Sequence, residues 1–142
     1  MKQHNFLKRA FCLLAISMLV ALSLFSTVAC KKTVVVDGDY VVITAENVED
    51  GATMYEYMLD LQEKGELTFE TVDGGYGEYI VSVNGVANDN NSYWMVYTSD
   101  ESNASMEHPA EYKGVQYGQA VLGISSLPVV EGETYILYYQ TF

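Results

Sequence analysis

Basic residues, cysteines and histidines are scarce in this chain of 142 residues. Seven Lys and Arg stand against 19 Asp and Glu, and only four of the basic residues follow Cys30. From Cys30 onward the chain therefore carries a net charge of −15 at neutral pH. A field of that sign repels phosphate backbones, so the sequence excludes nucleic acid as an expected partner.

The shortage of cysteine and histidine limits the chemistry that the chain can perform. Cys12 lies within the expected leader, so an exported chain keeps only Cys30 and can form neither an intramolecular disulfide nor a cysteine-based metal site. His108 is the only histidine after Cys30, and no Ser-His-Asp arrangement can be argued from its spacing. No pair of carboxylates stands out as an acid–base couple. The sequence therefore predicts a protein that is not an enzyme, with no catalytic residues, no metal site and no cofactor.

The N-terminus has the layout of a bacterial export signal. Lys2, Lys8 and Arg9 precede an uncharged run over residues 10–24, which is short for a membrane span but typical of a signal peptide. Residues 27–30, Thr-Val-Ala-Cys, resemble a lipobox, with threonine in place of the usual leucine. We expect residues 1–29 to be a lipoprotein signal peptide. An ordinary secretory signal and an uncleaved anchor are the alternatives.

Lipidation of Cys30 predicts where the protein resides. Acyl chains on Cys30 would hold it at the extracytoplasmic face of the cell membrane, because each buried methylene contributes about 0.8 kcal/mol. Lys31 and Lys32 would then lie beside anionic headgroups. We expect residues 30–38 to form the lipidated N-terminus and tether, and residues 39–142 to form one domain.

The rest of the chain alternates between β-rich runs and turns, with one helical segment. Thr53 and Glu56 have the spacing of a capping box, and Gly65 is a typical stop, so we expect a helix over residues 53–64. Residues 33–36 are either tether or an edge strand, and residues 98–114 are expected to be a long surface loop. The fold class is α+β, with one amphipathic helix packed against mostly antiparallel β-sheets. Strands are predicted at residues 40–44, 67–72, 79–83, 93–97 and 134–142, with a further short strand within 117–124.

From residue 76 onward the order of motifs is similar to a known family. Tyr-Gly-x-Tyr-Ile-x-Ser-Val-Asn-Gly over residues 76–85 is followed by Tyr93-Trp94, Gly123-Ile124, Leu127-Pro128 and residues 131–134. The set resembles the C-terminal domain of transcobalamin and intrinsic factor, and the bacterial domains of unknown function related to it. The resemblance implies a small domain that covers one face of cobalamin with backbone groups and with apolar or aromatic side chains.

The same resemblance names candidate ligand-binding residues. It implies Tyr93 and Trp94, with the segment Gly123-Ile124 as a backbone contact, and Tyr97 joins them as a third aromatic residue on the same predicted strand. Trp94 is itself either a core residue or a site residue.

Strand alternation predicts which of these rings are exposed. Trp94 and Val96 would face one side of the strand, with Tyr93, Met95 and Tyr97 on the other. Val96 indicates that the side of Trp94 is the core, which would expose the tyrosines.

These observations lead to an expected function. The chain is predicted to be a surface-anchored lipoprotein with a non-catalytic domain that binds a small ligand, for which a corrinoid such as cobalamin is the first candidate. The alternative is a protein–protein interaction or adhesion module at the cell surface, whose partner is another surface protein.

Overall fold

The computed structural model describes residues 32–142. The predicted signal peptide and Cys30 lie outside the described residues. Within residues 32–142, the single α-helix is too short and too polar to cross a membrane.

The helix α2 (Met54–Glu63) begins where the capping-box spacing predicts it. The hydroxyl of Thr53 accepts a hydrogen bond from the Glu56 N–H, and the Glu56 carboxylate accepts one from the Thr53 N–H at 2.8 Å. The chain leaves the helix at Gly65, whose φ of 73° is in the left-handed region. The helix buries one face made of Met54, Tyr57, Met58 and Leu61.

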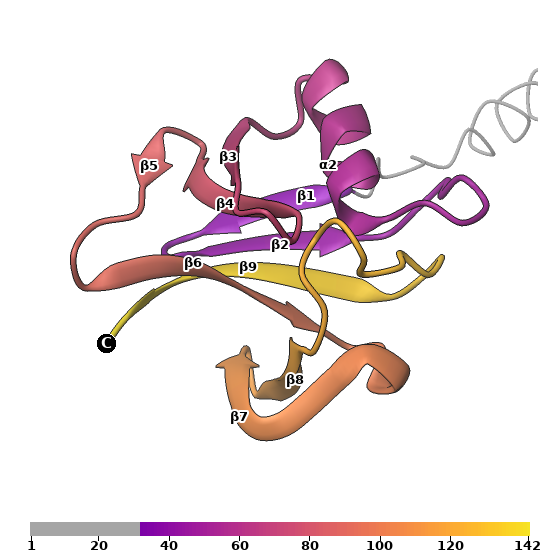
Figure 1. Ribbon diagram of the computed structural model, residues 1–142. Coiled ribbons are helices and arrows are strands. Elements are labelled where there is room, and N and C mark those ends of the chain that lie inside the picture. The colour runs from indigo at the N-terminus through magenta and orange to yellow at the C-terminus, as the bar shows by residue number, and fades with distance from the viewer. Residues whose placement is uncertain (1–31) are drawn as a thin grey trace, which may run out of the picture. The chain divides into compact units, whose positions relative to one another are not determined.

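Within residues 32–142, nine strands form two antiparallel sheets (Figure 1). The larger sheet has the order β1-β2-β9-β6-β8-β7, and the smaller one has the order β3-β4-β5. The α+β prediction, one helix with mostly antiparallel sheets, is therefore confirmed. The run at residues 33–36 is an edge strand, since β1 pairs with β2. The strands are β1 (Val34–Asp37), β2 (Tyr40–Thr44), β3 (Phe69–Asp73), β4 (Glu78–Val83), β5 (Val86–Ala87), β6 (Ser92–Thr98), β7 (Ala104–Tyr112), β8 (Val115–Ala120) and β9 (Thr134–Thr141).

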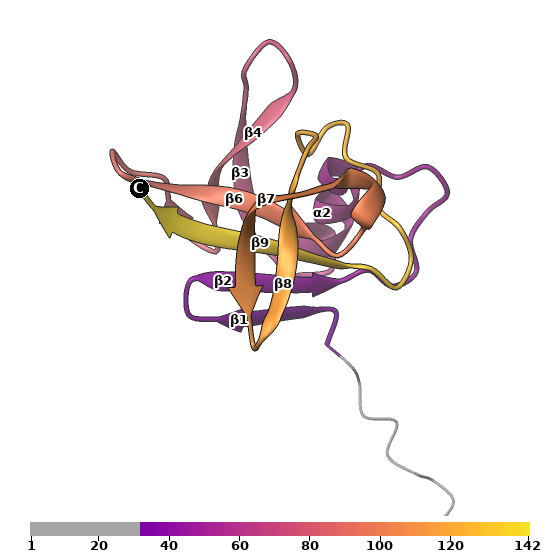
Figure 2. The same ribbon diagram turned by 90° about the horizontal axis from the view of Figure 1, so that it is seen from below.

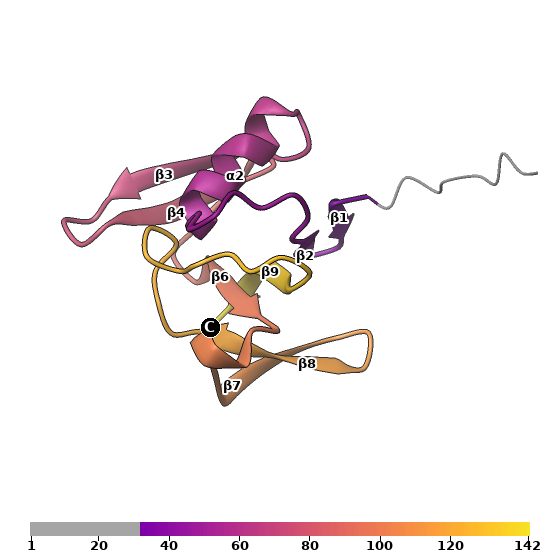
Figure 3. The same ribbon diagram turned by 90° about the vertical axis from the view of Figure 1, so that its right-hand side faces the viewer.

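The elements are stacked on both faces of the strands β1, β2, β9 and β6. Helix α2 and the smaller sheet cover one face, which we call the helix face (Figures 1 and 3). The hairpin β7–β8 curls back across the opposite face, which we call the hairpin face (Figure 2). The Tyr112 hydroxyl of β7 donates a hydrogen bond to Asp37 at the end of β1, so the two edge strands of the larger sheet meet at the tip of the hairpin.

Most of the hydrophobic core lies on the helix face. Tyr135 is fully buried there, and its hydroxyl donates to the Pro128 carbonyl at 3.1 Å and accepts from the Val130 N–H at 3.0 Å. These bonds hold the segment before β9 against the sheet. Other residues of this core include Ile43, Met54, Met58, Leu61, Leu67, Val83, Trp94, Leu127 and Leu137.

The prediction of a surface loop over residues 98–114 is wrong. A short 3-10 helix (Glu101–Asn103) leads into β7, which forms a hairpin with β8. The two-residue turn Lys113-Gly114 has positive φ at both positions, as tight hairpins require. Polar residues occupy β7 because most of its side chains are exposed to solvent, with Ala110 as its one buried residue.

Candidate ligand-binding groove

An apolar groove of about 580 Å³ lies between β4, β6 and the segment that follows β8. Four of the five residues proposed from the sequence line it: Tyr93, Trp94, Gly123 and Ile124. Residues that lie 30 positions apart in the chain thus meet at one surface.

The groove exists because two strands lack a pairing partner over part of their length. Strand β8 pairs with β6 only at Tyr97 and Thr98, which leaves the earlier part of β6 without a strand on that side. Strand β5 pairs with β4 only at Ser82 and Val83. The space beside the unpaired halves of β4 and β6 is the groove.

Asn88 links β4 to β6 beside the groove. Its backbone N–H donates to the Val81 carbonyl and its side-chain amide donates to the Ile80 carbonyl, both at 2.8 Å. Its side-chain oxygen accepts from the Trp94 N–H at 2.9 Å. A single residue therefore fixes the spacing between β4 and β6, and this residue was not found from the sequence, where it lies in a polar loop.

Trp94 is a core residue that also borders the groove. Its side chain is only 8% exposed, and its ring lies 5.2 Å from that of Tyr139. The indole N–H donates to the Val86 carbonyl at 2.7 Å. Because its polar atom is satisfied internally, Trp94 offers a ligand its apolar surface rather than a hydrogen bond.

Exposed apolar side chains surround the groove. Tyr79 is 55% exposed and Val121 58%, and Tyr93 and Leu122 are also exposed. Contiguous exposed apolar residues on a small domain typically mark a binding surface. Tyr79, Val121 and Leu122 were missed because each lies in or beside a predicted strand, where an apolar residue is ordinarily assigned to the core.

The ring of Tyr79 lies directly over Gly74. A Cβ atom added at Gly74 would come within 2.0 Å of the Tyr79 ring. Glycine at this position therefore allows the ring to pack on the backbone of the β3–β4 hairpin.

Tyr97 does not belong to the groove, and the expectation that it is exposed is wrong. Tyr97 is 3% exposed, and its hydroxyl donates to the Gln140 side chain at 2.7 Å. Burial raises the pKa of Tyr97 above its usual value. The physical reason is the hairpin β7–β8, which covers this part of β6 and creates a second core with Tyr40, Tyr138 and Ile136.

The groove has a negative electrostatic character. Among residues 32–142 the basic side chains are Lys32, Lys64 and Lys113. Lys64 pairs with Asp60 and Lys113 pairs with Asp37. None of the three lysines lines the groove, whereas Glu78 does.

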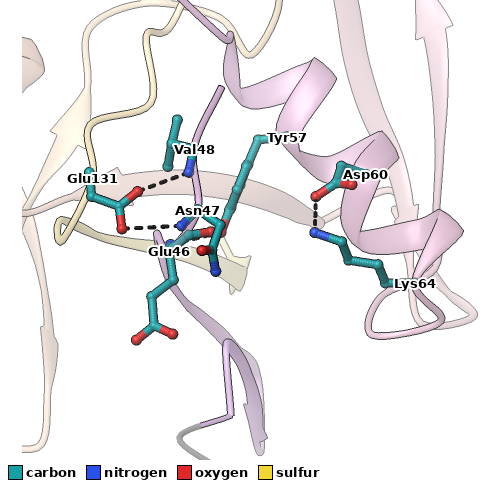
Figure 4. A network of polar contacts seen from close by, with 7 residues as sticks. All are labelled: Glu46, Asn47, Val48, Tyr57, Asp60, Lys64 and Glu131. Atoms are coloured by element: carbon teal, nitrogen blue, oxygen red, sulfur yellow. Dashed lines mark hydrogen bonds and ion pairs between the residues drawn. The ribbon is translucent and has the colours of Figure 1, made fainter. Parts of the chain in front are cut away.

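A second hollow, of about 330 Å³, lies beside α2, and its lining includes the acidic residues Glu49, Glu56, Asp60 and Glu63. Three of its polar side chains, Tyr57, Asp60 and Lys64, already make contacts within the fold (Figure 4). The Tyr57 hydroxyl donates to the Glu46 carbonyl at 3.0 Å, and Asp60 pairs with Lys64. The nearby Glu131 carboxylate accepts from the N–H groups of Asn47 and Val48. This network stabilises the approach to the helix.

No group of three or more potential metal ligands occurs within residues 32–142. His108 lies on β7 and lines a hollow of about 220 Å³ on the hairpin face.

No protein-family model matches the chain, and no curated protein matches it either. The resemblance to the transcobalamin C-terminal domain stays a prediction.

Proposed function

We propose that this chain is a lipid-anchored, non-catalytic binding protein whose groove takes a small, flat, largely apolar ligand. A corrinoid is the first candidate. The observation that supports this function best is the groove itself, because Trp94, Gly123 and Ile124 line one apolar hollow. Binding would rest on apolar contact and on backbone groups, with no covalent step.

Trp94 provides a direct readout, since it is the only tryptophan in the chain. Residues 32–142 are titrated with cyanocobalamin and with cobinamide, and the indole emission is recorded with N-acetyltryptophanamide as the correction for absorption by the corrinoid. The proposal expects saturable quenching. Quenching that matches the free indole would contradict corrinoid binding.

Gly123 allows the groove to be blocked without disturbing the fold. A Cβ atom at this position meets no other atom within 4 Å. We expect Gly123→Leu to keep its unfolding midpoint and to lose ligand binding at least tenfold. Two exposed apolar residues give a matched pair of variants. Leu122 lines the groove, so Leu122→Asp should weaken binding. Val115 lies on the hairpin β7–β8, so Val115→Asp should leave binding unchanged.

A second candidate function is contact with another surface protein. Exposed apolar side chains favour this alternative. The most exposed of them is Tyr76, which is 95% exposed at the tip of the β3–β4 hairpin. A photo-crosslinking residue at position 76, used on intact cells, would give a discrete protein adduct under this alternative. The corrinoid titration would then show no saturation.

The anchor is tested separately. Cys30→Ser should release the protein from membranes into the soluble fraction, because the lipid is attached at that sulfur. A variant that stays in the membrane fraction would indicate an uncleaved anchor.

A further inference from the structure

Past Tyr79 the groove continues into a smaller hollow of about 270 Å³, which is distinct from the hollow beside α2. The two hollows share Glu78, Tyr79 and Gly123. The larger one is mainly apolar, whereas Ser125 and Ser126 contribute hydroxyl groups to the smaller one. A ligand that occupies both therefore meets an apolar surface at one end and a polar surface at the other.

Glu78 lies where the two hollows join. Its backbone N–H donates to the Ser125 hydroxyl at 2.8 Å, which fixes the backbone at this point. Its side chain is partly buried, and within residues 32–142 its carboxylate has no hydrogen bond or ion pair. A carboxylate that lines a hollow and has no internal partner keeps its acceptor capacity for a ligand.

The surroundings leave that charge uncompensated. The two lysines that form ion pairs, Lys64 and Lys113, are held by Asp60 and Asp37, and no lysine of residues 32–142 lines either hollow. A bound anion would therefore be repelled by Glu78, whereas a hydrogen-bond donor or a cation would be attracted.

We infer that Glu78 makes the groove selective for amphipathic ligands with an apolar body and a neutral or cationic donor arm, and that it rejects anionic ligands. The apolar body occupies the larger hollow. The arm, an amide, hydroxyl or ammonium group, reaches the Glu78 carboxylate at the entrance to the smaller hollow. This inference rests on the proposed function of the groove.

The test compares two fluorescent probes that share one ring system. N-phenyl-1-naphthylamine is neutral and carries an N–H donor, and 8-anilinonaphthalene-1-sulfonate adds a negative charge. Both are titrated into residues 32–142, and the ratio of their dissociation constants is recorded. We expect Glu78→Gln to bind the sulfonate about tenfold more tightly than the wild type does, with little change for the neutral probe. Addition of 0.5 M NaCl should reduce the difference between the two proteins.

Glu70→Gln is the matched control. Glu70 is an exposed glutamate on the neighbouring strand β3, and it lines neither hollow. Glu70→Gln removes the same charge from the molecule as Glu78→Gln does. If both variants bind the sulfonate more tightly by the same factor, the change is an effect of net charge and the role of Glu78 is overturned.

A second probe pair tests the donor arm. The wild type should prefer the 1-naphthylmethylammonium ion over 1-naphthylmethanol by about fivefold, and Glu78→Gln should lose that preference. Suppose that the probes bind the wild type and lose binding in Gly123→Leu, while Glu78→Gln leaves the ratio of dissociation constants unchanged within both probe pairs. That result would overturn the inference about Glu78 and would still support binding in the groove. If no probe binds the wild type, the proposed function fails and the inference fails with it.

Discussion

The two faces of the larger sheet differ in how their cores are closed. On the helix face, apolar side chains pack beneath α2 and the smaller sheet, and the groove lies at the margin of this core. On the hairpin face, tyrosine rings such as Tyr40 and Tyr138, stacked 4.4 Å apart, lie beneath the hairpin β7–β8. The core on the helix face is made mainly of aliphatic and methionine side chains, whereas the core on the hairpin face is made largely of tyrosine rings. The apolar groove lies where the pairing of β6 with β8 is incomplete.

The largest expected effect compares two adjacent residues of β9 that point to opposite faces. Leu137 and Ile136 are both fully buried. We expect Leu137→Ala to cost about 4 kcal/mol of unfolding free energy and Ile136→Ala about 2.5 kcal/mol, because a two-stranded hairpin can relax into a cavity more readily than a helix-covered core. Urea denaturation followed by circular dichroism measures both. Equal costs, or the reverse order, would remove the difference between the faces.

The next effect concerns Asn88, which links β4 to β6. Asn88→Ala removes its two side-chain hydrogen bonds, to Ile80 and Trp94, and should cost about 2 kcal/mol. It should also shift the emission of Trp94 to longer wavelength as water reaches the indole. Asn90→Ala is the control, because the side chain of Asn90 is exposed in the same loop. A red shift in the control as large as in Asn88→Ala would argue against a special role for Asn88.

A smaller effect separates two tyrosines of β6. Tyr97→Phe should cost about 1 kcal/mol, since it removes a buried hydroxyl from the Gln140 side chain. Tyr93→Phe should cost only a few tenths of a kcal/mol, because the Tyr93 hydroxyl makes an exposed bond of 3.3 Å to the Asn90 carbonyl. Thermal unfolding of both variants checks the order, and a larger loss in Tyr93→Phe would contradict the burial of Tyr97.

The smallest effect is the pH dependence of the hairpin tip. Hydrogen bonds from Lys113 and Tyr112 lower the pKa of Asp37 below its usual value. A carboxyl group whose pKa is lowered on folding adds stability above its unfolded pKa, and this contribution disappears as the pH falls through the folded pKa. NMR titration of the Asp37 carboxyl carbon should give a midpoint below the usual one. Lys113→Ala should move the midpoint upward, and an unchanged midpoint would mean that the contact does not persist in solution.

The sequence predicts the helix face well and the hairpin face poorly. Thr53 and Glu56 identify the helix because a capping box is a local signal. Residues 104–112 resemble a loop because β7 is stabilised by its pairing with β8 and exposes most of its side chains. The burial of Tyr97 depends on that distant hairpin, so alternation along β6 alone cannot predict it.

The groove was predictable only in part. Residues 93–94 and 123–124 were proposed together from a resemblance, and the structure brings them to one surface. Asn88, Tyr79 and Glu78 acquire their places from contacts between segments, such as the bonds from Asn88 to Val81 and Ile80. No local pattern in the sequence carries that information.

The most direct test of the central claim maps ligand contacts residue by residue. Residues 32–142, labelled with nitrogen-15, are titrated with cyanocobalamin while backbone amide resonances are followed. Saturable shifts are expected at Trp94, Gly123 and Ile124, with Tyr97 and Tyr138 unmoved. Shifts that cluster on the hairpin face, or no saturable shifts, would contradict binding of a corrinoid in the groove.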